Sequence, residues 1–327
     1  MVRLSILCLL LGLYRVQSLF CGDFPENECV ERNLCRIQSG HEGCSAAETC
    51  CPTKDVLRFP VPGVPACGYA NRDSLTLNIA EEDTAEAELP WMVLLLDARN
   101  DQAVGGGSLI KPDVVLSATT ATRNLLESQL IVRAGEWDLS SDTEMGKHED
   151  VAIRKIVRHP DFQLNSGANN VALLFLERPL QRTRHINLIC LPSPNRQFTR
   201  NRCIVSGWDK KNINDVSHAS LMKKIEVPLV DNFTCEQKLR QLYSASFNLH
   251  DSLICAGGET GKDTCKVGGG SPLVCSHQSD PNRYEQVGIV NFGAECGEAI
   301  PTVYTDVSKM RPWIFQQILE NLLGSQE

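Results

Sequence analysis

The sequence predicts an all-β body that ends in one helix and follows a small cysteine-rich unit. After about Leu89, short apolar or alternating runs recur between clusters of Gly, Asn, Asp and Pro, which is typical of a β-sandwich or β-barrel. A helical pattern follows at Val307–Leu323, and six cysteines crowd into residues 21–51. A length of 327 residues leaves room for two domains.

Residues 1–18 have the pattern of a secretory signal peptide. Arg3 precedes the apolar run Leu4–Leu13, and Val16-Gln17-Ser18 follow where signal peptidase cuts. A membrane anchor is the alternative, but the run is shorter than the roughly 20 apolar residues that a span requires. We therefore expect a secreted, extracellular protein with no membrane span.

Cysteine usage supports an extracellular location. Cys8 leaves with the signal peptide, and the even number that remains of the 15 cysteines suggests disulfides formed in an oxidising compartment. Residues 19–51 are predicted to be a disulfide-stapled domain, since so short a segment buries little apolar surface. Spacing alone leaves the pairing open, and secretion together with the adjacent pair Cys50-Cys51 argues against a zinc site. The six cysteines of this domain are Cys21, Cys29, Cys35, Cys44, Cys50 and Cys51.

A proline-rich linker is expected over residues 52–78, with Cys67 in need of a distant partner. The strands that follow are expected at Trp91–Leu96, Val114–Ala118, Leu130–Ala134, Val171–Leu176, Cys203–Trp208, Leu273–Ser276 and Val287–Phe292. In the terminal helix, one face is expected to carry Trp313, Ile314, Ile318, Leu319 and Leu322. The net charge of −8 argues against a nucleic-acid partner.

Several stretches between residue 79 and the C-terminus resemble the chymotrypsin/trypsin family, and they occur in the family's order. They are Leu89–Trp91, Gly106–Ile110, Val171–Leu174, Ile189–Pro192, Ser206–Trp208, Ser271–Cys275 and Pro301–Thr305. The resemblance implies a chymotrypsin-like double antiparallel β-barrel over residues 79–327, with the active site between the barrels. The unit at residues 19–51 resembles an arthropod clip domain.

The resemblance also shows where this chain departs from the family. Thr120 stands at the position of the catalytic histidine, Asn170 at that of the aspartate, and Gly269 at that of the nucleophilic serine. A threonine cannot serve as the general base, and a glycine has no nucleophile. The resemblance therefore implies that the triad is lost.

Two further positions lie in the same motif as Gly269. Val267 replaces a glycine that supplies an oxyanion N–H, and Gly268 replaces the aspartate that pairs with the new N-terminus after activation. Residues 77–82 also lack the activation cleavage sequence. Ser271 is the alternative nucleophile, but no histidine stands at the position where its partner is expected. We therefore predict a pseudoprotease.

The family's disulfide pattern implies a partner for each remaining cysteine. The implied pairs are Cys21–Cys50, Cys29–Cys44, Cys35–Cys51, Cys67–Cys190, Cys203–Cys275, Cys235–Cys255 and Cys265–Cys296. The family disulfide beside the histidine is missing, because its two positions read Gly105 and Ala121.

Other candidate sites are weaker. By resemblance, a remnant of a Lys/Arg specificity pocket is formed by Asp263, Asn291, Phe292, Gly293 and Thr302. Asn232 begins a glycosylation sequon. We expect no cofactor and no metal, although some relatives bind calcium in the loop that here carries Glu136, Asp138, Asp142, Glu144 and Glu149.

The function implied by the resemblance is that of a non-catalytic cofactor or modulator of a protease cascade. Its expected partners are other cascade proteins in the haemolymph, namely clip-domain proteases and prophenoloxidase, in innate immunity and melanisation. The alternative is an adhesion protein that binds microbial surfaces, and an active endopeptidase is disfavoured. Lys54, Arg58 and Arg72 offer cleavage sites for an upstream trypsin-like enzyme.

Overall fold

The computed structural model describes residues 27–31, 48–52, 67–71, 82–141, 143–144, 146–194, 196, 198, 202–210, 218–260, 267–277, 280–293 and 299–324. The contacts divide the chain into two compact units, Met1–Pro62 with Glu320–Glu327, and Gly63–Leu319. In the first unit, β1 (Asn27–Glu31) pairs antiparallel with β2 (Glu48–Pro52). Cys50 and Cys51 of β2 are both disulfide-bonded. The predicted signal peptide lies outside the described residues, as does most of the predicted clip domain and linker.

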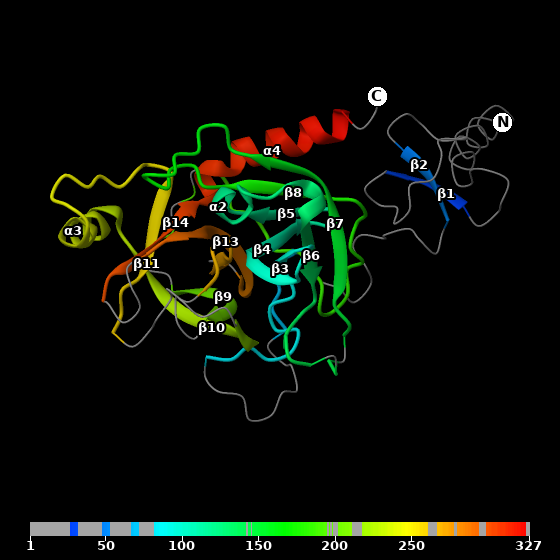
Figure 1. Cartoon of the computed structure of the whole chain (residues 1–327), viewed down its shortest axis with the longest axis horizontal. Coiled ribbons are helices and arrows are strands. Elements are labelled where there is room, and N and C mark those ends of the chain that lie inside the picture. Colours follow the sequence, from blue (N-terminus) through cyan, green and yellow to red (C-terminus); the bar gives the residue numbers. More distant parts are fainter. Residues whose placement is uncertain are drawn as a thin grey trace, which may run out of the picture. The chain divides into compact units, whose positions relative to one another are not determined.

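Within the described residues, the second unit contains two closed antiparallel barrels of six strands each (Figure 1). The first barrel consists of β3 (Met92–Asp97), β4 (Gln102–Lys111), β5 (Val114–Ser117), β8 (Ala172–Leu176), β7 (Glu149–Arg158) and β6 (Leu130–Ala134), in that spatial order. The second consists of β10 (His218–Val230), β11 (Leu253–Gly257), β14 (Pro301–Asp306), β13 (Asp280–Phe292), β12 (Pro272–His277) and β9 (Arg202–Lys210). The predicted double barrel is confirmed.

Strand β3 shows why the first barrel forms where it does. All of its residues are buried, although successive side chains of a strand point to opposite faces. Val93 and Leu95 point into the core of the first barrel. Met92 and Leu94 point the other way, into a cluster that also contains Ile289 of the second barrel. A strand with apolar residues on both faces is therefore placed between two cores.

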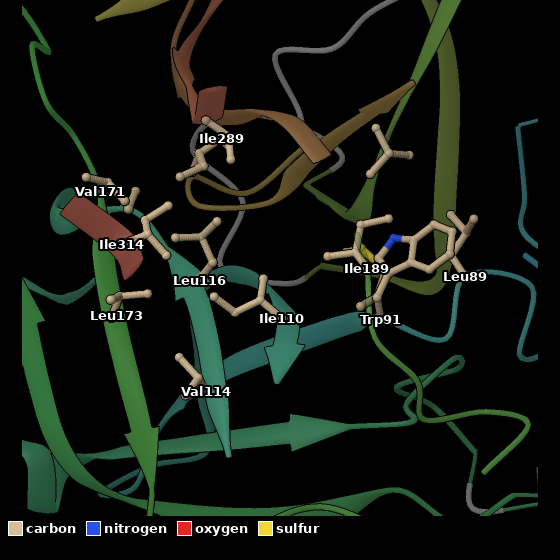
Figure 2. Packing of buried hydrophobic residues seen from close by; sticks show 14 of the residues in the cluster. Leu89, Trp91, Ile110, Val114, Leu116, Val171, Leu173, Ile189, Ile289 and Ile314 are labelled. Atoms are coloured by element: carbon tan, nitrogen blue, oxygen red, sulfur yellow. The ribbon is translucent and has the colours of Figure 1, made fainter. Parts of the chain in front are cut away.

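The terminal helix α4 (Val307–Gly324) packs on this shared cluster. Figure 2 shows Ile314 beside Leu116 and Val171, and Ile314 is fully buried. The predicted amphipathic face is wrong in part, because Leu319 is 57% exposed and Leu322 is 38% exposed. Leu319 directly follows the buried Ile318, so it lies about 100° around the helix and points away from the cluster.

The described residues also form the short helix α2 (Thr119–Thr122) and the single 3₁₀ turn η3 (Glu127–Gln129). A longer helix, α3 (Asn232–Leu242), was not predicted from the sequence. Helix α3 begins after Asp231, whose carboxylate accepts a hydrogen bond from the backbone N–H of Thr234 at 2.9 Å. Its buried face consists only of Cys235 and Leu239, which is too little apolar periodicity to stand out. None of the helices in the described ranges is long and apolar enough to cross a membrane.

Polar contacts also connect the two barrels. The Ser108 hydroxyl of β4 donates to Gln286 Oε1 of β13, and both side chains are fully buried. Nearby, the backbone N–H of Gly106 donates to the carbonyl oxygen of Gly269 at 3.1 Å. These contacts bring the loop before β12 against β4, which is where the candidate site lies.

Candidate functional site

Thr120, the position predicted to replace the catalytic histidine, lies in α2, just after β5. The Thr119 hydroxyl anchors this helix by donating to the carbonyl oxygen of Val171 at 2.8 Å. The backbone N–H of Thr120 donates to Asn170 Oδ1 at 3.0 Å, and Asn170 Nδ2 donates to Thr120 Oγ1 at 3.0 Å. The structure thus brings together two of the three predicted triad positions.

Asn170 is fully buried two residues before β8 and takes part in a hydrogen-bond network. Its Nδ2 also donates to Asn291 Oδ1 at 2.8 Å, and Asn291 Nδ2 donates to the Gly167 carbonyl at 2.7 Å and to Thr305 Oγ1 at 3.1 Å. The Thr305 hydroxyl in turn donates to the Asn170 carbonyl at 3.0 Å. Neutral amides and hydroxyls therefore satisfy one another here, and none of these groups titrates near neutral pH.

Part of this network was not predicted from the sequence. Thr305 and Gly167 were not among the candidate residues, and Asn291 was expected in the specificity pocket. A signal was present in the resemblance, because Asn170 stands at the position of the family's aspartate and Asn291 also departs from the family's residue at its position. The amide of Asn170 carries two N–H donors that a carboxylate lacks, and the Thr120 hydroxyl and the Asn291 carbonyl accept them.

Gly269, the predicted nucleophile position, borders open space. A Cβ atom built on Gly269 would meet no atom within 4 Å. A Cβ built on Gly105 would lie 2.7 Å from the Gly269 carbonyl oxygen and 2.9 Å from Ala121 Cβ. The two positions of the missing disulfide are therefore neighbours, and they lie beside Gly269.

The structure does not support Ser271 as an alternative nucleophile. Ser271 is 1% exposed, and its hydroxyl oxygen would lie 3.1 Å from a Cβ built on Gly207. Val267 is also buried, and its Cγ1 would lie 3.0 Å from a Cβ built on Gly207. Ser271 is thus packed against β9 and is closed to a substrate.

Comparison with known proteins identifies the family. The family model described as Trypsin matches residues 79–314. The chain is 39% identical to phenoloxidase-activating factor 2 of Galleria mellonella, over 82% of this chain and 91% of that protein. This chain is a member of the clip-domain serine protease family. It is also 35% identical to inactive CLIP domain-containing serine protease A28 of Anopheles gambiae, over 83% of this chain and 73% of that protein. Identity to phenoloxidase-activating factor 3 of Holotrichia diomphalia is 31%, over 91% of this chain and 86% of that protein.

In this clip-domain protease homologue, two predicted pocket residues lie close together. A Cβ built on Gly293 would lie 3.0 Å from Thr302 Oγ1. The Tyr243 hydroxyl donates to the Gly293 carbonyl at 3.3 Å, and its ring meets Phe292 edge-on at 6.3 Å. The threonine side chain therefore occupies space beside the glycine backbone. Asp263, the predicted charge of the pocket, lies outside the described residues.

In the part of this clip-domain homologue that the structure describes, both cysteines are placed for three disulfides, and each of these is among the implied pairs. They are Cys67–Cys190, Cys203–Cys275 and Cys235–Cys255. The remaining pairs, Cys265–Cys296, Cys21–Cys50, Cys29–Cys44 and Cys35–Cys51, each involve at least one cysteine outside the described residues and stay predictions.

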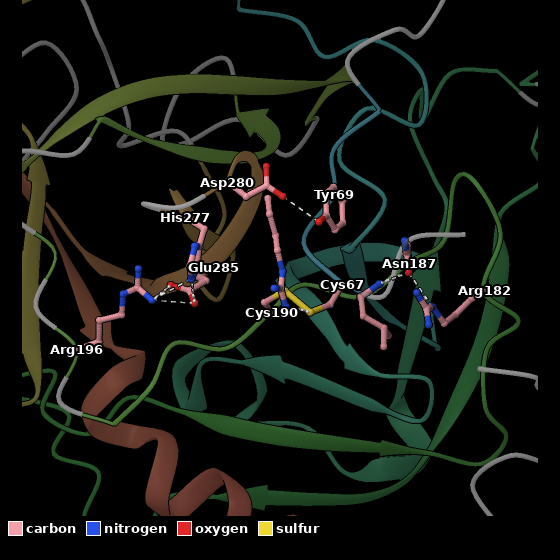
Figure 3. Close-up of a disulfide and its surroundings, with 11 residues drawn as sticks. Cys67, Tyr69, Arg182, Asn187, Cys190, Arg196, His277, Asp280 and Glu285 are labelled. Carbon is pink, nitrogen blue, oxygen red and sulfur yellow. Dashed lines mark hydrogen bonds and ion pairs between the residues drawn. A yellow bond between two sulfur atoms is a disulfide. The ribbon is translucent and has the colours of Figure 1, made fainter. Parts of the chain in front are cut away.

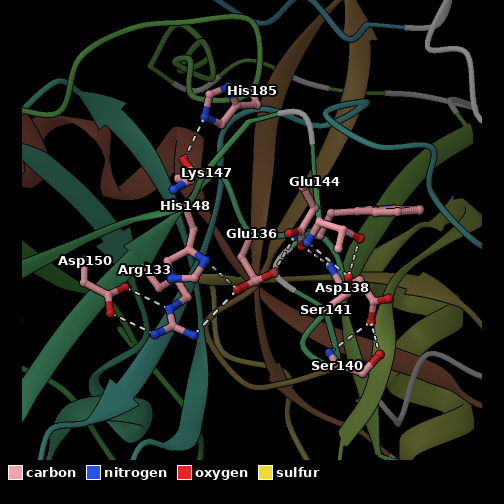
Figure 4. Close-up of polar contacts among 12 residues, drawn as sticks. Arg133, Glu136, Asp138, Ser140, Ser141, Glu144, Lys147, His148, Asp150 and His185 are labelled. Atoms are coloured by element: carbon pink, nitrogen blue, oxygen red, sulfur yellow. Dashed lines mark hydrogen bonds and ion pairs between the residues drawn. The ribbon is translucent and has the colours of Figure 1, made fainter.

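The acidic loop after β6 forms internal hydrogen bonds (Figure 4). Glu136 is buried, and its Oε2 lies 3.2 Å from His148 Nδ1 and 3.6 Å from Arg133 Nη1. Burial, together with a hydrogen bond to Glu144, raises the pKa of Glu136 to about 7. Asp138 Oδ1 accepts hydrogen bonds from the backbone N–H and hydroxyl of Ser140.

The carboxylates of this loop that the structure describes are thus engaged by protein donors. Asp142 lies outside the described residues, and Glu149 accepts a hydrogen bond from Arg178 at 2.8 Å. Among the side chains described, no three from His, Cys, Asp or Glu form a group that could hold a metal ion.

Proposed function

We propose that this clip-domain homologue is a secreted protein without peptidase activity. The observation that supports this is the reciprocal pair of hydrogen bonds between Thr120 and Asn170, beside a nucleophile position that is Gly269. Proton transfer in this family requires a serine, a histidine and an aspartate that orients the histidine. Removing an entire triad costs about 10⁶-fold in turnover.

We further propose that the protein acts as a cofactor or modulator of an extracellular cascade that activates prophenoloxidase in melanisation. The names of two relatives support this, since both are phenoloxidase-activating factors, and a third is named as inactive. A rigid, disulfide-linked scaffold with surface loops can bind the partners of an enzyme without doing chemistry.

Two measurements test the proposal separately. Purified protein is expected to hydrolyse a Lys/Arg ester no faster than buffer and to resist labelling by a serine-reactive phosphonate. Prophenoloxidase and a clip-domain protease are then combined with and without the protein, and phenoloxidase activity is measured. Ester hydrolysis abolished by the phosphonate contradicts the first claim. An unchanged phenoloxidase activity contradicts the second, and retention on microbial cell walls would then favour an adhesion protein.

We also propose that Asn232 carries an N-linked glycan. Asn232 is exposed at the first position of α3, and Thr234 of its sequon is exposed as well. A mass shift on treatment with peptide N-glycosidase F is expected in protein secreted from insect cells. The Asn232→Gln variant should show none.

A further inference from the structure

The guanidinium group of Arg283 contacts both sulfur atoms of the Cys67–Cys190 disulfide. Arg283 Nε donates to Cys190 Sγ at 3.1 Å, and Nη2 donates to Cys67 Sγ at 3.3 Å. Arg283 lies in β13, and its backbone forms an isolated bridge with Tyr69, two residues after Cys67. Figure 3 shows the disulfide with Tyr69 and Asp280 beside it. The sulfur atoms therefore lie next to a fixed positive charge.

The two sulfur-bearing residues differ in exposure. Cys190 is 5% exposed, whereas Cys67 is partly exposed. The other two disulfides that the structure defines are shielded, since all four of their cysteines are 0% exposed. Among these three bonds, an external thiol therefore has access only to the one beside Arg283.

The charge of Arg283 is not neutralised by an ion pair with any of the described residues. The nearby Asp280 instead accepts hydrogen bonds from the Tyr69 hydroxyl at 2.9 Å and from the backbone N–H of Asn282 at 3.1 Å. A guanidinium beside sulfur stabilises the thiolate over the thiol, and a more stable thiolate is a faster leaving group in thiol–disulfide exchange.

We propose that Cys67–Cys190 is a reactive disulfide that exchanges with dithiols while the protein stays folded. A thiolate of the dithiol attacks Cys67 Sγ, the Cys67–Cys190 bond breaks, and Cys190 leaves as a thiolate held by Arg283. The second thiol of the dithiol, on losing its proton, attacks the mixed disulfide and releases Cys67 as a thiolate. The dithiol ends as a disulfide, and its two electrons reside on the two cysteines.

Hydrogen bonds hold the segment around Cys67 in place when the disulfide opens. Gly68 pairs with the body on both sides, its N–H donating to the Leu188 carbonyl and its carbonyl accepting from the Tyr284 N–H, both at 2.7 Å. Asn71 Nδ2 donates to the carbonyl of Ala87 at 2.6 Å. The bond spans 123 residues of sequence, so its redox state decides whether a fragment cut between Cys67 and Cys190 stays covalently attached.

The first test uses the native full chain and limiting dithiothreitol. Samples are quenched with iodoacetamide over time, and labelled cysteines are located by mass spectrometry. Cys67 and Cys190 are expected to be labelled at least about tenfold faster than Cys203 and Cys275, because access to the sulfur limits exchange. Labelling of Cys203–Cys275 or Cys235–Cys255 at the same rate or faster overturns the proposal.

The second test separates the charge from simple exposure. Arg283→Gln is expected to slow opening about fivefold, since the leaving thiolate loses its stabilising charge. Arg202→Gln, which removes an exposed arginine paired with Glu226, is the matched control and should leave the rate unchanged. A rate that is unchanged or higher in Arg283→Gln overturns the role of the guanidinium.

A monothiol gives a third, independent outcome. With glutathione followed by iodoacetamide, the mixed disulfide is expected on Cys67 and the alkyl group on Cys190. The reverse labelling contradicts the proposed direction of attack. None of these measurements depends on the proposed role in the cascade. A failure of the disulfide proposal can therefore be distinguished from a failure of the proposed function.

Discussion

Thr120 and Asn170 form two hydrogen bonds in opposite directions, from a backbone N–H to an amide oxygen and from an amide N–H to a hydroxyl, both 3.0 Å long. By the resemblance to the family, these are the predicted positions of the catalytic histidine and aspartate, which share a proton-bearing contact in an active enzyme. The contact between the two positions persists here, but both partners are neutral. Local packing is thus maintained by groups that cannot move a proton near neutral pH.

A serine restored at Gly269 is expected to leave the protein inactive. The side chain fits, because a Cβ built there meets no atom within 4 Å, but Thr120 cannot accept the serine proton. Hydrolysis of a Lys/Arg ester and phosphonate labelling of Gly269→Ser should match the wild type. Gly324→Ser adds a serine at another open position and is the control. More phosphonate labelling of Gly269→Ser than of Gly324→Ser would show that the site contains a base.

The Asn170→Asp substitution is expected to lower the free energy of unfolding by about 2 kcal/mol, because it leaves buried polar groups unpaired. The new carboxylate would face Asn291 Oδ1 at the distance of the present 2.8 Å hydrogen bond. Turning the Asn291 amide would remove the donor to the Gly167 carbonyl and to Thr305. Chemical denaturation monitored by circular dichroism measures the change.

A matched control and a rescue accompany that variant. Asn100 is exposed and only accepts a hydrogen bond through its side chain, from the backbone N–H of Gln102, so Asn100→Asp should be neutral. Adding Asn291→Ser to Asn170→Asp supplies a hydroxyl donor and should recover part of the loss. Equal stability of the Asn170→Asp variant and the wild type would contradict the network as described.

The raised pKa of Glu136 predicts that stability falls between pH 5 and pH 8. Because the folded protein holds the Glu136 proton up to about pH 7, the stabilising contribution is complete below the ordinary range of a glutamate and is lost as pH rises through 7. Glu136→Gln should weaken this pH dependence of stability. Between pH 5 and pH 8, the Tm of the variant should fall roughly 3 °C less than that of the wild type. Arg133, His148 and Glu144 face this carboxylate and remain in the variant.

Glu226→Gln serves as the comparison for the pH series, since Glu226 is exposed and paired with Arg202. Its Tm profile should parallel the wild type. A Glu136→Gln profile that also parallels the wild type would show that Glu136 titrates as an ordinary glutamate.

Helix α4 provides a test of the face that packs on the barrels. Ile314→Ala is expected to cost about 3 kcal/mol because it leaves a cavity at a fully buried side chain. Leu319→Ala should change stability by less than about 0.5 kcal/mol, since this leucine is 57% exposed. Urea denaturation of both variants measures the difference. Equal losses would restore the face predicted from sequence.

Much of the fold could be predicted from the sequence because the apolar pattern is local. The run at β3 and the period of α4 each report burial within a few residues. The prediction was wrong at Leu319, since periodicity gives a hydrophobic stripe but not its edge. Helix α3 was not predicted, because only two of its residues are buried and they give a weak hydrophobic periodicity.

By itself, the sequence determined which chemical groups this protein lacks. A threonine, an asparagine and a glycine have fixed chemistry wherever they are placed, so the expectation of a missing base and nucleophile required only the motifs around Thr120, Asn170 and Gly269. Tertiary structure alone decided what these positions do instead. Asn170 meets Asn291 from 121 residues away, and Arg283 meets Cys67 from 216 residues away. Contacts of this kind depend on how the two barrels bring together segments that are far apart in the sequence. No local pattern in the chain indicates which distant segments will meet.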